Sequence, residues 1–236
     1  TQFEYLDDLR FGLSTRNTIE KIDVDATAST RQKKQEGNYF DSYLGLDFLY
    51  DKRNQNYQTT SGFYSNYNIN LPVVSDTNTL TNVYNYKVFK ELYENNVSTF
   101  SFLFKSASSL TNDDIKLSER LYIPGKKLRG FESGKIGPKD GSDYIGGNYV
   151  SSINATTTIP MILENVQNVD IVMFADAANV WGVDYDSSLD KSGIRSSIGI
   201  GIDWLTVVGP LTFSFAQPIT KEPVSYTHLR AHETGY

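Results

Sequence analysis

Apolar and polar residues alternate with a period of two along most of the chain, and this alternation indicates β-strands. Between residues 197 and 204, isoleucine and tryptophan occupy the even positions, whereas serine, glycine and aspartate occupy the odd ones. Residues 211–216 repeat the contrast after a short turn that contains Gly209 and Pro210. Two alternating segments joined by such a turn predict a β-hairpin.

The same pattern recurs often enough to predict an all-β fold. Polar loops at 21–39, 73–78, 110–144 and 182–194 alternate with mostly shorter links at 51–61, 93–96, 160–167 and 206–209. Long loops at one end and short turns at the other are typical of outer-membrane β-barrels. The nine expected strands are centred near Phe11, Leu46, Tyr67, Tyr86, Phe102, Ile153, Met173, Ile200 and Phe213.

A soluble β-sandwich or a lipocalin-like barrel would also alternate apolar and polar positions. Two features favour a membrane barrel instead. The polar rows are rich in Asn, Ser, Thr and Gly, as a wet lumen requires, and aromatic residues stand at strand ends, where a membrane interface would hold them. These aromatic residues are Tyr50, Tyr84 and Trp204. We therefore expect an antiparallel transmembrane β-barrel.

Composition and charge narrow the function classes. The chain has 236 residues, enough for one β domain, and 13% of them are aromatic. The net charge is −6 and the longest basic block is Lys126-Lys127, which argues against a nucleic-acid partner. The chain has no cysteine, so neither a disulfide nor a thiolate metal site can form.

The final residues break the alternation. Residues 224–236 have no dyad pattern and contain both histidines, His228 and His232. The string resembles an in-frame translation of a sequencing-library adapter, so we interpret it as non-native. The expected organisation is a barrel domain at 1–223 and a non-native tail at 224–236.

The strongest motif lies between the fifth and sixth expected strands. A Leu-Arg-Gly-Phe sequence is followed by Ile-Gly-Pro and then by Gly-Gly-Asn at 146–148. Gly130 permits a tight reversal, Phe131 can pack against the wall, and Arg129 can meet an anion inside the barrel. Arg-Gly-Phe alone is a weak signal, but the combination with Ile-Gly-Pro and Gly-Gly-Asn at these spacings is a strong one. The candidate loop residues are Leu128, Arg129, Gly130, Phe131, Ile136, Gly137 and Pro138.

This arrangement resembles the sixth extracellular loop of BamA-type outer-membrane assembly proteins, the bacterial surface antigen family, whose Arg-Gly-Phe motif folds back into the barrel lumen. Residues 174–181 are similar to the family's strand with an inward Asp, here Asp176, and 197–204 and 209–218 resemble the next two strands. Asp-Lys-Arg at 51–53 resembles the family's Asp-x-Arg turn. The match extends to about Glu222. It implies a partial barrel, the seventh to fifteenth of sixteen strands, with a long inward-folded loop.

Strand parity adds a contact to this resemblance. The apolar row of residues 170–181 falls on odd positions, which places Asp176 on the lumen face. We therefore predict that Arg129 points into the lumen and pairs with Asp176. At Thr156 the family often has a carboxylate, so Asp176 is expected to be the single wall anion near Arg129.

The resemblance implies a non-enzymatic factor that inserts β-barrel proteins into the bacterial outer membrane. Its partners would be the lipid bilayer, unfolded outer-membrane proteins and accessory assembly lipoproteins, with no cofactor. A related two-partner-secretion or autotransporter-assembly pore is the alternative, although the motifs at 136–138 and 146–148 favour the BamA type. A fused lipase would need a Gly-x-Ser-x-Gly elbow, which this sequence lacks.

Other candidate sites are interpreted structurally. Asp184, Asp186, Ser188 and Asp190 are spaced like a cation-binding loop, but the Gly and helix of a calcium hand are out of register. Both histidines lie in the suspect tail, so a Ser-His catalytic pair has no credible base. We predict neither a metal site nor catalytic residues.

Overall fold

A computed structural model describes residues 2–6, 8–56, 58–94, 96–111, 113–159, 168–190, 193–207, 209–220 and 230–233. The strands are β1 (Gln2–Leu6), β2 (Leu9–Ile22), β3 (Gly37–Asp51), β4 (Gly62–Ser75), β5 (Thr79–Tyr93), β6 (Asn96–Ser109), β7 (Lys139–Asp140), β8 (Asp143–Tyr144), β9 (Tyr149–Ile159), β10 (Val169–Trp181), β11 (Arg195–Thr206), β12 (Gly209–Pro218) and β13 (Arg230–Glu233). The helical segments are α1 (Thr30–Lys33) and the 3₁₀ turns Leu117–Glu119, Gly125–Lys127 and Ser187–Leu189. None of the helices among the described residues has the length and apolar character needed to cross a membrane.

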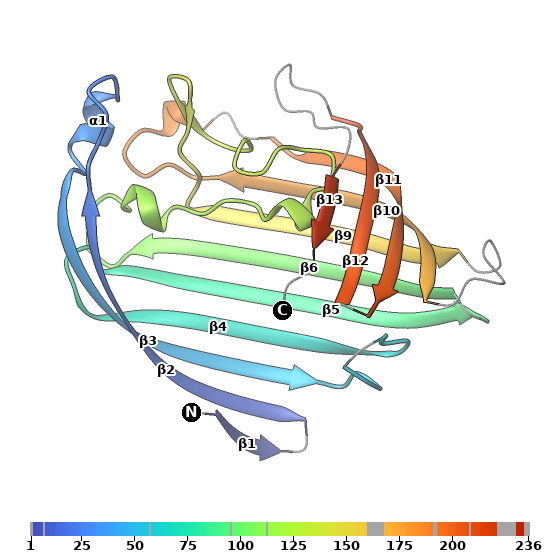
Figure 1. The fold of residues 1–236 in the computed structure, drawn as a ribbon. Helices are drawn as coiled ribbons and strands as arrows, with labels where there is room; N and C mark the ends of the chain where they lie inside the picture. Colours follow the sequence, from blue (N-terminus) through green and yellow to red (C-terminus); the bar gives the residue numbers. More distant parts are fainter. Residues whose placement is uncertain are drawn as a thin grey trace.

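Eleven strands form one antiparallel sheet in the order β1-β2-β3-β4-β5-β6-β9-β10-β11-β12-β13, and β7 pairs with β8 in a separate small hairpin. The sheet curls strongly but stays open (Figure 1). The expected antiparallel partial barrel is therefore confirmed, and each of the nine expected strands is present. The sheet has two further strands because β1 and β13 extend its edges. They have only 5 and 4 residues, too few for alternation to identify them from the sequence.

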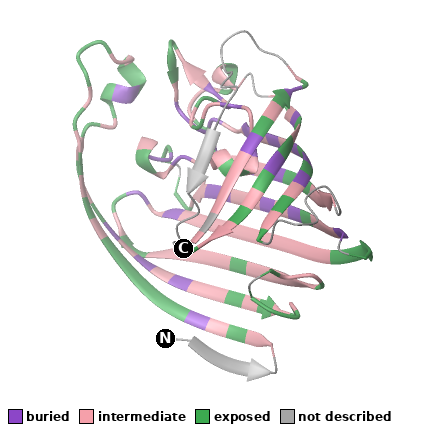
Figure 2. Cartoon of the chain, turned by 45° about the vertical axis from the view of Figure 1, so that its right-hand side comes forward, coloured by how far each residue is buried: buried purple, intermediate pink, exposed green. Residues whose placement is uncertain are grey.

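The two faces of the sheet differ as the alternation requires. In β10, Phe174, Asp176 and Ala178 are buried on the concave side, whereas Met173 and Ala175 are exposed on the convex side. Figure 2 shows this alternation of buried and exposed positions along the strands. The convex side carries large exposed apolar residues, including Phe100 and Ile200, as a lipid-facing wall does.

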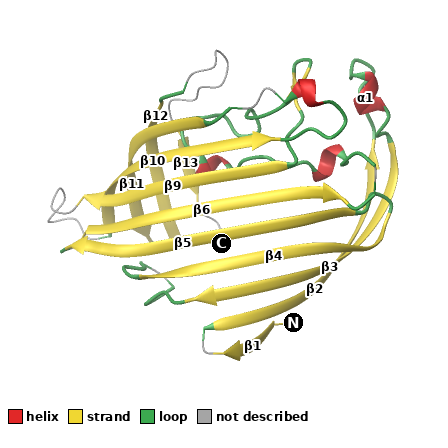
Figure 3. Ribbon diagram, turned by 180° about the vertical axis from the view of Figure 1, so that it is seen from behind, coloured by secondary structure: helices red, strands yellow, loops and turns green. Residues whose placement is uncertain are grey.

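The links differ between the two ends of the sheet. At one end β5 joins β6 through residues 94–95, and β11 joins β12 through 207–208. At the other end β10 joins β11 through 182–194, and β6 joins β9 through 110–148 (Figure 3). The expected loops at 21–39 and 73–78 are shorter in the structure, spanning 23–36 and 76–78, because strand pairing continues through polar residues. The expected link at 160–167 lies outside the described residues.

The C-terminal tail is described only in part. Residues 221–229 and 234–236 lie outside the described residues, whereas Arg230–Glu233 form β13 and pair with β12. The lack of alternation in the tail did not predict this pairing with β12. That residues 224–236 are non-native stays a prediction.

Candidate functional site: a loop clamped inside the barrel

The 110–148 loop folds back against the concave face of the sheet. Leu128, Phe131 and Ile136 from the loop pack with Val150 and Val180 from the wall in one buried apolar cluster. Phe131 has only 2% of its surface exposed, so the expected aromatic contact with the wall is present. Burial of these side chains favours the folded-back loop by removing apolar surface from water.

Arg129 and Asp176 lie in contact at the centre of this interface. Arg129 Nε is 2.7 Å from Asp176 Oδ2, and Arg129 Nη2 is 2.7 Å from Oδ1, which makes the pair bidentate. The backbone N–H of Arg129 also donates to Oδ2, at 3.1 Å. The Asp176 side chain is fully buried and that of Arg129 is 15% exposed. Among the described residues, Asp176 is the single carboxylate that forms an ion pair with Arg129.

The guanidinium of Arg129 makes two further contacts. Its Cζ lies 3.5 Å from the centre of the Phe174 ring, and Nη2 lies 3.4 Å from Thr156 Oγ1. Thr156 thus contributes one long hydrogen bond to the guanidinium. Arginine has a planar cation that can stack on an aromatic ring and bind a carboxylate through two parallel hydrogen bonds. Lysine cannot make both contacts, so this site requires arginine.

Three neighbouring strands hold the backbone of the loop. Asn154 of β9 donates to the carbonyl of Lys127 at 2.9 Å and to Asp176 Oδ1 at 2.9 Å. Ser197 of β11 donates to the carbonyl of Arg129 at 2.7 Å. With Asp176 of β10, these contacts fix one short loop segment to β9, β10 and β11, an arrangement that we call the clamp.

Two glycines of the motif permit the close approach. Gly130 has φ +86°, and a Cβ there would lie 2.8 Å from Ala216 Cβ. Gly137 has φ +108°, and a Cβ there would lie 2.8 Å from Val180 Cβ. Any side chain would therefore meet both backbone strain and a steric clash. Pro138, which follows, is fully buried and its carbonyl accepts from Ile145 N–H at 3.1 Å.

A second group of buried charges attaches the loop to the opposite part of the wall, and the sequence did not reveal it. Lys116 Nζ lies 2.7 Å from Asp41 Oδ2 and 3.0 Å from Glu20 Oε2. The Lys116 and Asp41 side chains are 3% and 2% exposed. Glu119 accepts hydrogen bonds from Tyr43, Thr77 and Thr79. We call this group the distal anchor.

Arg120 continues the distal anchor toward the 182–194 loop. Its side chain is fully buried, pairs with Asp184 and donates to Asn148 Oδ1 at 3.2 Å. Alternation along the chain cannot indicate these partners, because Arg120 and Asp184 are 64 residues apart in the sequence and Lys116 and Asp41 are 75 residues apart.

The aspartates at 184–190 have partners within the protein. Asp184 also accepts from Ile115 N–H at 2.6 Å, Asp186 pairs with Arg31, and Asp190 accepts from Gly182 N–H at 2.7 Å. The part of the chain that the structure describes contains no cluster of His or carboxylate residues that could hold a metal ion.

The Asp-x-Arg turn at the short-link end is also formed. Arg53 Nε and Nη2 donate to the Asp51 carboxylate at 2.9 and 2.7 Å. Lys52 N–H donates to the carbonyl of Phe63 at 2.8 Å, which continues the β3–β4 pairing one residue beyond the end of β3.

Burial within the clamp changes the ionisation of one loop residue. Burial, together with the nearby charges of Lys87 and Lys126, lowers the pKa of Lys127 to about 8. Lys127 Nζ donates to Ser101 Oγ at 3.2 Å. The clamp therefore contains a cation whose charge opposes the folded-back position of the loop.

Comparison with known proteins identifies the family. The model of the Omp85 superfamily domain matches residues 3–229 of this chain. The chain belongs to the Omp85 superfamily. This Omp85 domain is thus a β-barrel domain of the bacterial outer membrane, in agreement with the expected BamA-type resemblance.

Curated relatives of this Omp85 domain include two bacterial assembly factors and a yeast protein. The outer membrane protein assembly factor BamA of Neisseria meningitidis serogroup B is 32% identical over 47% of the chain. That of Nitratidesulfovibrio vulgaris is 24% identical over 85% of it, and a SAM50-like protein of Schizosaccharomyces pombe is 28% identical over 47%. The chain spans only 17%, 26% and 25% of the length of these relatives.

A solved structure supports the fold. The crystal structure of BamA from Haemophilus ducreyi lacking POTRA domains 1–3 superposes with a TM-score of 0.85 at 22% identity. The match covers 98% of this Omp85 domain and 52% of the other chain. At this identity the likeness concerns the fold.

Proposed function

We propose that this Omp85 domain belongs to a protein that assembles other β-barrel proteins and inserts them into the outer membrane. The observation that carries the proposal is that an Omp85 match over residues 3–229 coincides with relatives named as outer membrane protein assembly factors. Its clients would be unfolded outer-membrane proteins. Its other partners would be the lipid bilayer and accessory assembly lipoproteins.

The clamp suggests how the domain serves this activity. Arg129, Gly130 and Phe131 hold the loop against β9–β11 through an ion pair and apolar contacts, which are groups suited to positioning. We infer that the loop keeps this part of the wall rigid while client strands are added elsewhere, and that the domain acts without covalent chemistry. The secretion-pore alternative is not favoured, because the named relatives are assembly factors.

The test uses the complete gene product in phospholipid vesicles. Vesicles with the protein should accelerate folding of a urea-unfolded outer-membrane β-barrel client. The folded fraction is measured from the difference in mobility between heated and unheated samples on SDS gels. Empty vesicles, and vesicles with an unrelated porin, are the controls. Equal folding rates in all three preparations would refute the proposed function, and export of a soluble passenger without client folding would favour the secretion pore.

A further inference from the structure

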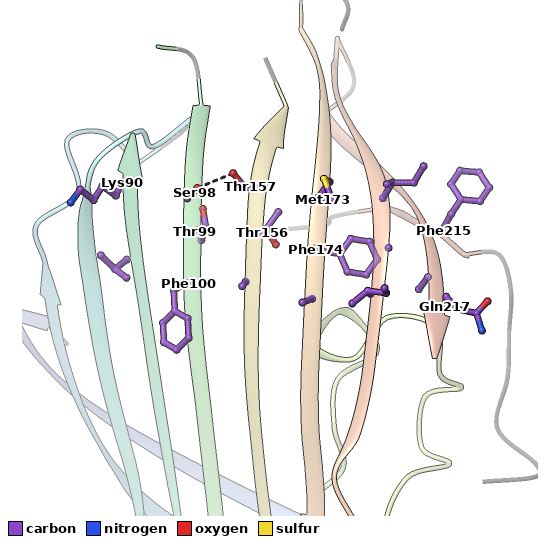
Figure 4. Close-up of a pocket in the computed structure, with 17 residues that line it drawn as sticks. Lys90, Ser98, Thr99, Phe100, Thr156, Thr157, Met173, Phe174, Phe215 and Gln217 are labelled. Atoms are coloured by element: carbon purple, nitrogen blue, oxygen red, sulfur yellow. Dashed lines mark hydrogen bonds between the residues drawn. The ribbon is translucent and has the colours of Figure 1, made fainter. Parts of the chain in front are cut away.

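The convex face of the sheet contains a mainly apolar trough of about 970 Å³ across β5, β6 and β9–β12. Figure 4 shows it from the side on which Phe100 and Phe215 project. Most of the side chains that form it alternate with the clamp residues along the same strands: Ala155 and Ala175 face the trough, whereas Asn154 and Asp176 face the lumen. The trough is therefore on the lipid-facing side of the wall.

Small residues opposite one another create the hollow. Ala155 of β9 is paired with Ala175 of β10, and these two exposed alanines form its floor. Their neighbours across the sheet, Phe100 and Ile198, are bulky and rise on either side. The result is the trough, on a wall that is otherwise covered by large apolar side chains.

One corner of the trough is polar. Lys90, Ser98 and Thr157 lie in register on β5, β6 and β9, and Ser98 Oγ is 2.8 Å from Thr157 Oγ1. Lys90 is exposed, and no salt bridge joins it to an acidic side chain among the described residues. This corner lies toward the ends of β5 and β9 that carry the shorter links, which is the periplasmic end in outer-membrane barrels.

We propose that this trough binds one anionic phospholipid of the periplasmic leaflet. The phosphate contacts Lys90 and the hydroxyls of Ser98 and Thr157, while an acyl chain lies over Ala155 and Ala175. A lysine near the edge of a membrane wall reaches toward lipid phosphates, and an unpaired cation there favours an anionic headgroup. A volume of about 970 Å³ is within the range of binding sites for small ligands.

A lipid fits this surface better than a polypeptide. Strands β6, β9, β10 and β11 are paired on both sides along the trough, so they offer no free backbone donors and acceptors to an added strand; in β12, β13 pairs with residues 211–214 but not with 215–217. What they offer is an apolar groove with a charge at one end, which matches the shape of a lipid. The inference rests on the membrane location of the domain and is independent of the proposed assembly activity.

The first experiment is native mass spectrometry of the complete gene product released from nanodiscs that contain equal amounts of phosphatidylglycerol and phosphatidylcholine. The wild type should retain one lipid, mainly phosphatidylglycerol. Ala175→Leu fills the floor and should abolish retention. Lys90→Gln should reduce the preference for phosphatidylglycerol about fivefold. Matched controls are Ala177→Leu, on the same face but outside the trough, and Lys33→Gln, in α1; both should behave as the wild type.

A second measurement needs no variant. Phosphatidylglycerol with a photoactivatable acyl chain should label wild-type peptides that contain residues 155–157 and 173–175 more than the convex faces of β3 and β4. Labelling spread evenly over the wall would overturn the proposal, as would unchanged lipid retention in Ala175→Leu or an unchanged headgroup preference in Lys90→Gln. A photoreactive residue at position 200 that captured a polypeptide in place of lipid would overturn it as well.

Discussion

At the scale of single residues, the clamp depends on how fully Arg129 and Asp176 satisfy one another. Asp176 accepts two hydrogen bonds from the guanidinium, one from the Arg129 backbone and one from Asn154. These donors satisfy the oxygens of the buried carboxylate, whereas removal of the guanidinium leaves it with few partners.

Arg129→Ala should therefore release the 125–138 part of the loop without unfolding the strands. Breaking a fully buried pair costs about 3–5 kcal/mol, and less where lumen water reaches the site. Hydrogen exchange of the complete gene product should show faster exchange at 125–138 and unchanged protection in β9 and β10. Arg129→Lys should rescue poorly, because it retains the charge but loses the planar fork. Lys135→Ala, in an exposed loop position, is the control, and unchanged loop protection in Arg129→Ala would contradict the prediction.

Lys127 should make the loop sensitive to pH. Its pKa is about 8 in the folded protein against an ordinary value of 10.5, so the charged form opposes docking. The penalty is complete below about pH 8 and disappears as the pH rises toward 10.5, so docking should strengthen over this window. Since the chain has no cysteine, a spin label at Ser133→Cys can report the mobile fraction between pH 7 and 9.5. Lys127→Met should abolish the dependence and Lys126→Met should retain it; the reverse would exclude Lys127 as the titrating group.

At the scale of elements, strands and loop differ in how far the sequence determines them. Period-two alternation predicted the position of Asp176 on the lumen face, because parity within β10 needs no knowledge of the rest of the fold. The clamp residues on the loop were predicted from the resemblance of their motif to a known family. The pairing of Lys116 with Asp41 could not be predicted, because it depends on the path of a loop that crosses the sheet.

The two attachments of the loop should respond separately to substitution. Lys116→Ala leaves Asp41 buried without its cation, so residues 113–121 should exchange faster. Residues 128–138 should stay protected, since the clamp has its own ion pair and apolar cluster. A double variant with Arg129→Ala should combine both effects additively. Loss of protection throughout 113–138 in Lys116→Ala alone would show instead that the loop is one cooperative unit.

At the scale of the whole molecule, the sheet has two free edges, β1 and β13. Unpaired edge strands expose backbone groups that pair readily with other chains. The 236-residue chain on its own should therefore form oligomers or aggregates in detergent, measured by light scattering after size exclusion. A monodisperse, closed monomer would contradict this expectation.

The tail should prove foreign to the gene. We propose that residues 224–236 are not native, since they lack the lipid-facing row that a wall strand requires. Resequencing the source gene across codon 223 tests this directly. An uninterrupted reading frame encoding His228 and His232 would establish the tail as native and β13 as a genuine edge strand.

The loop also joins two distant points on one arc. Lys116 is fastened at β3 and Arg129 at β10, with β4, β5, β6 and β9 between them in the sheet. The connecting residues, 116–129, therefore form a chord across the lumen, and a chain of this size spans at most about 45 Å. Because this segment has a limited length, it sets an upper bound on the distance between β3 and β10 across the lumen. The bore of this part of the barrel therefore cannot exceed the reach of the residues between the two ion pairs, and inserting residues there should raise this limit while both attachments stay in place.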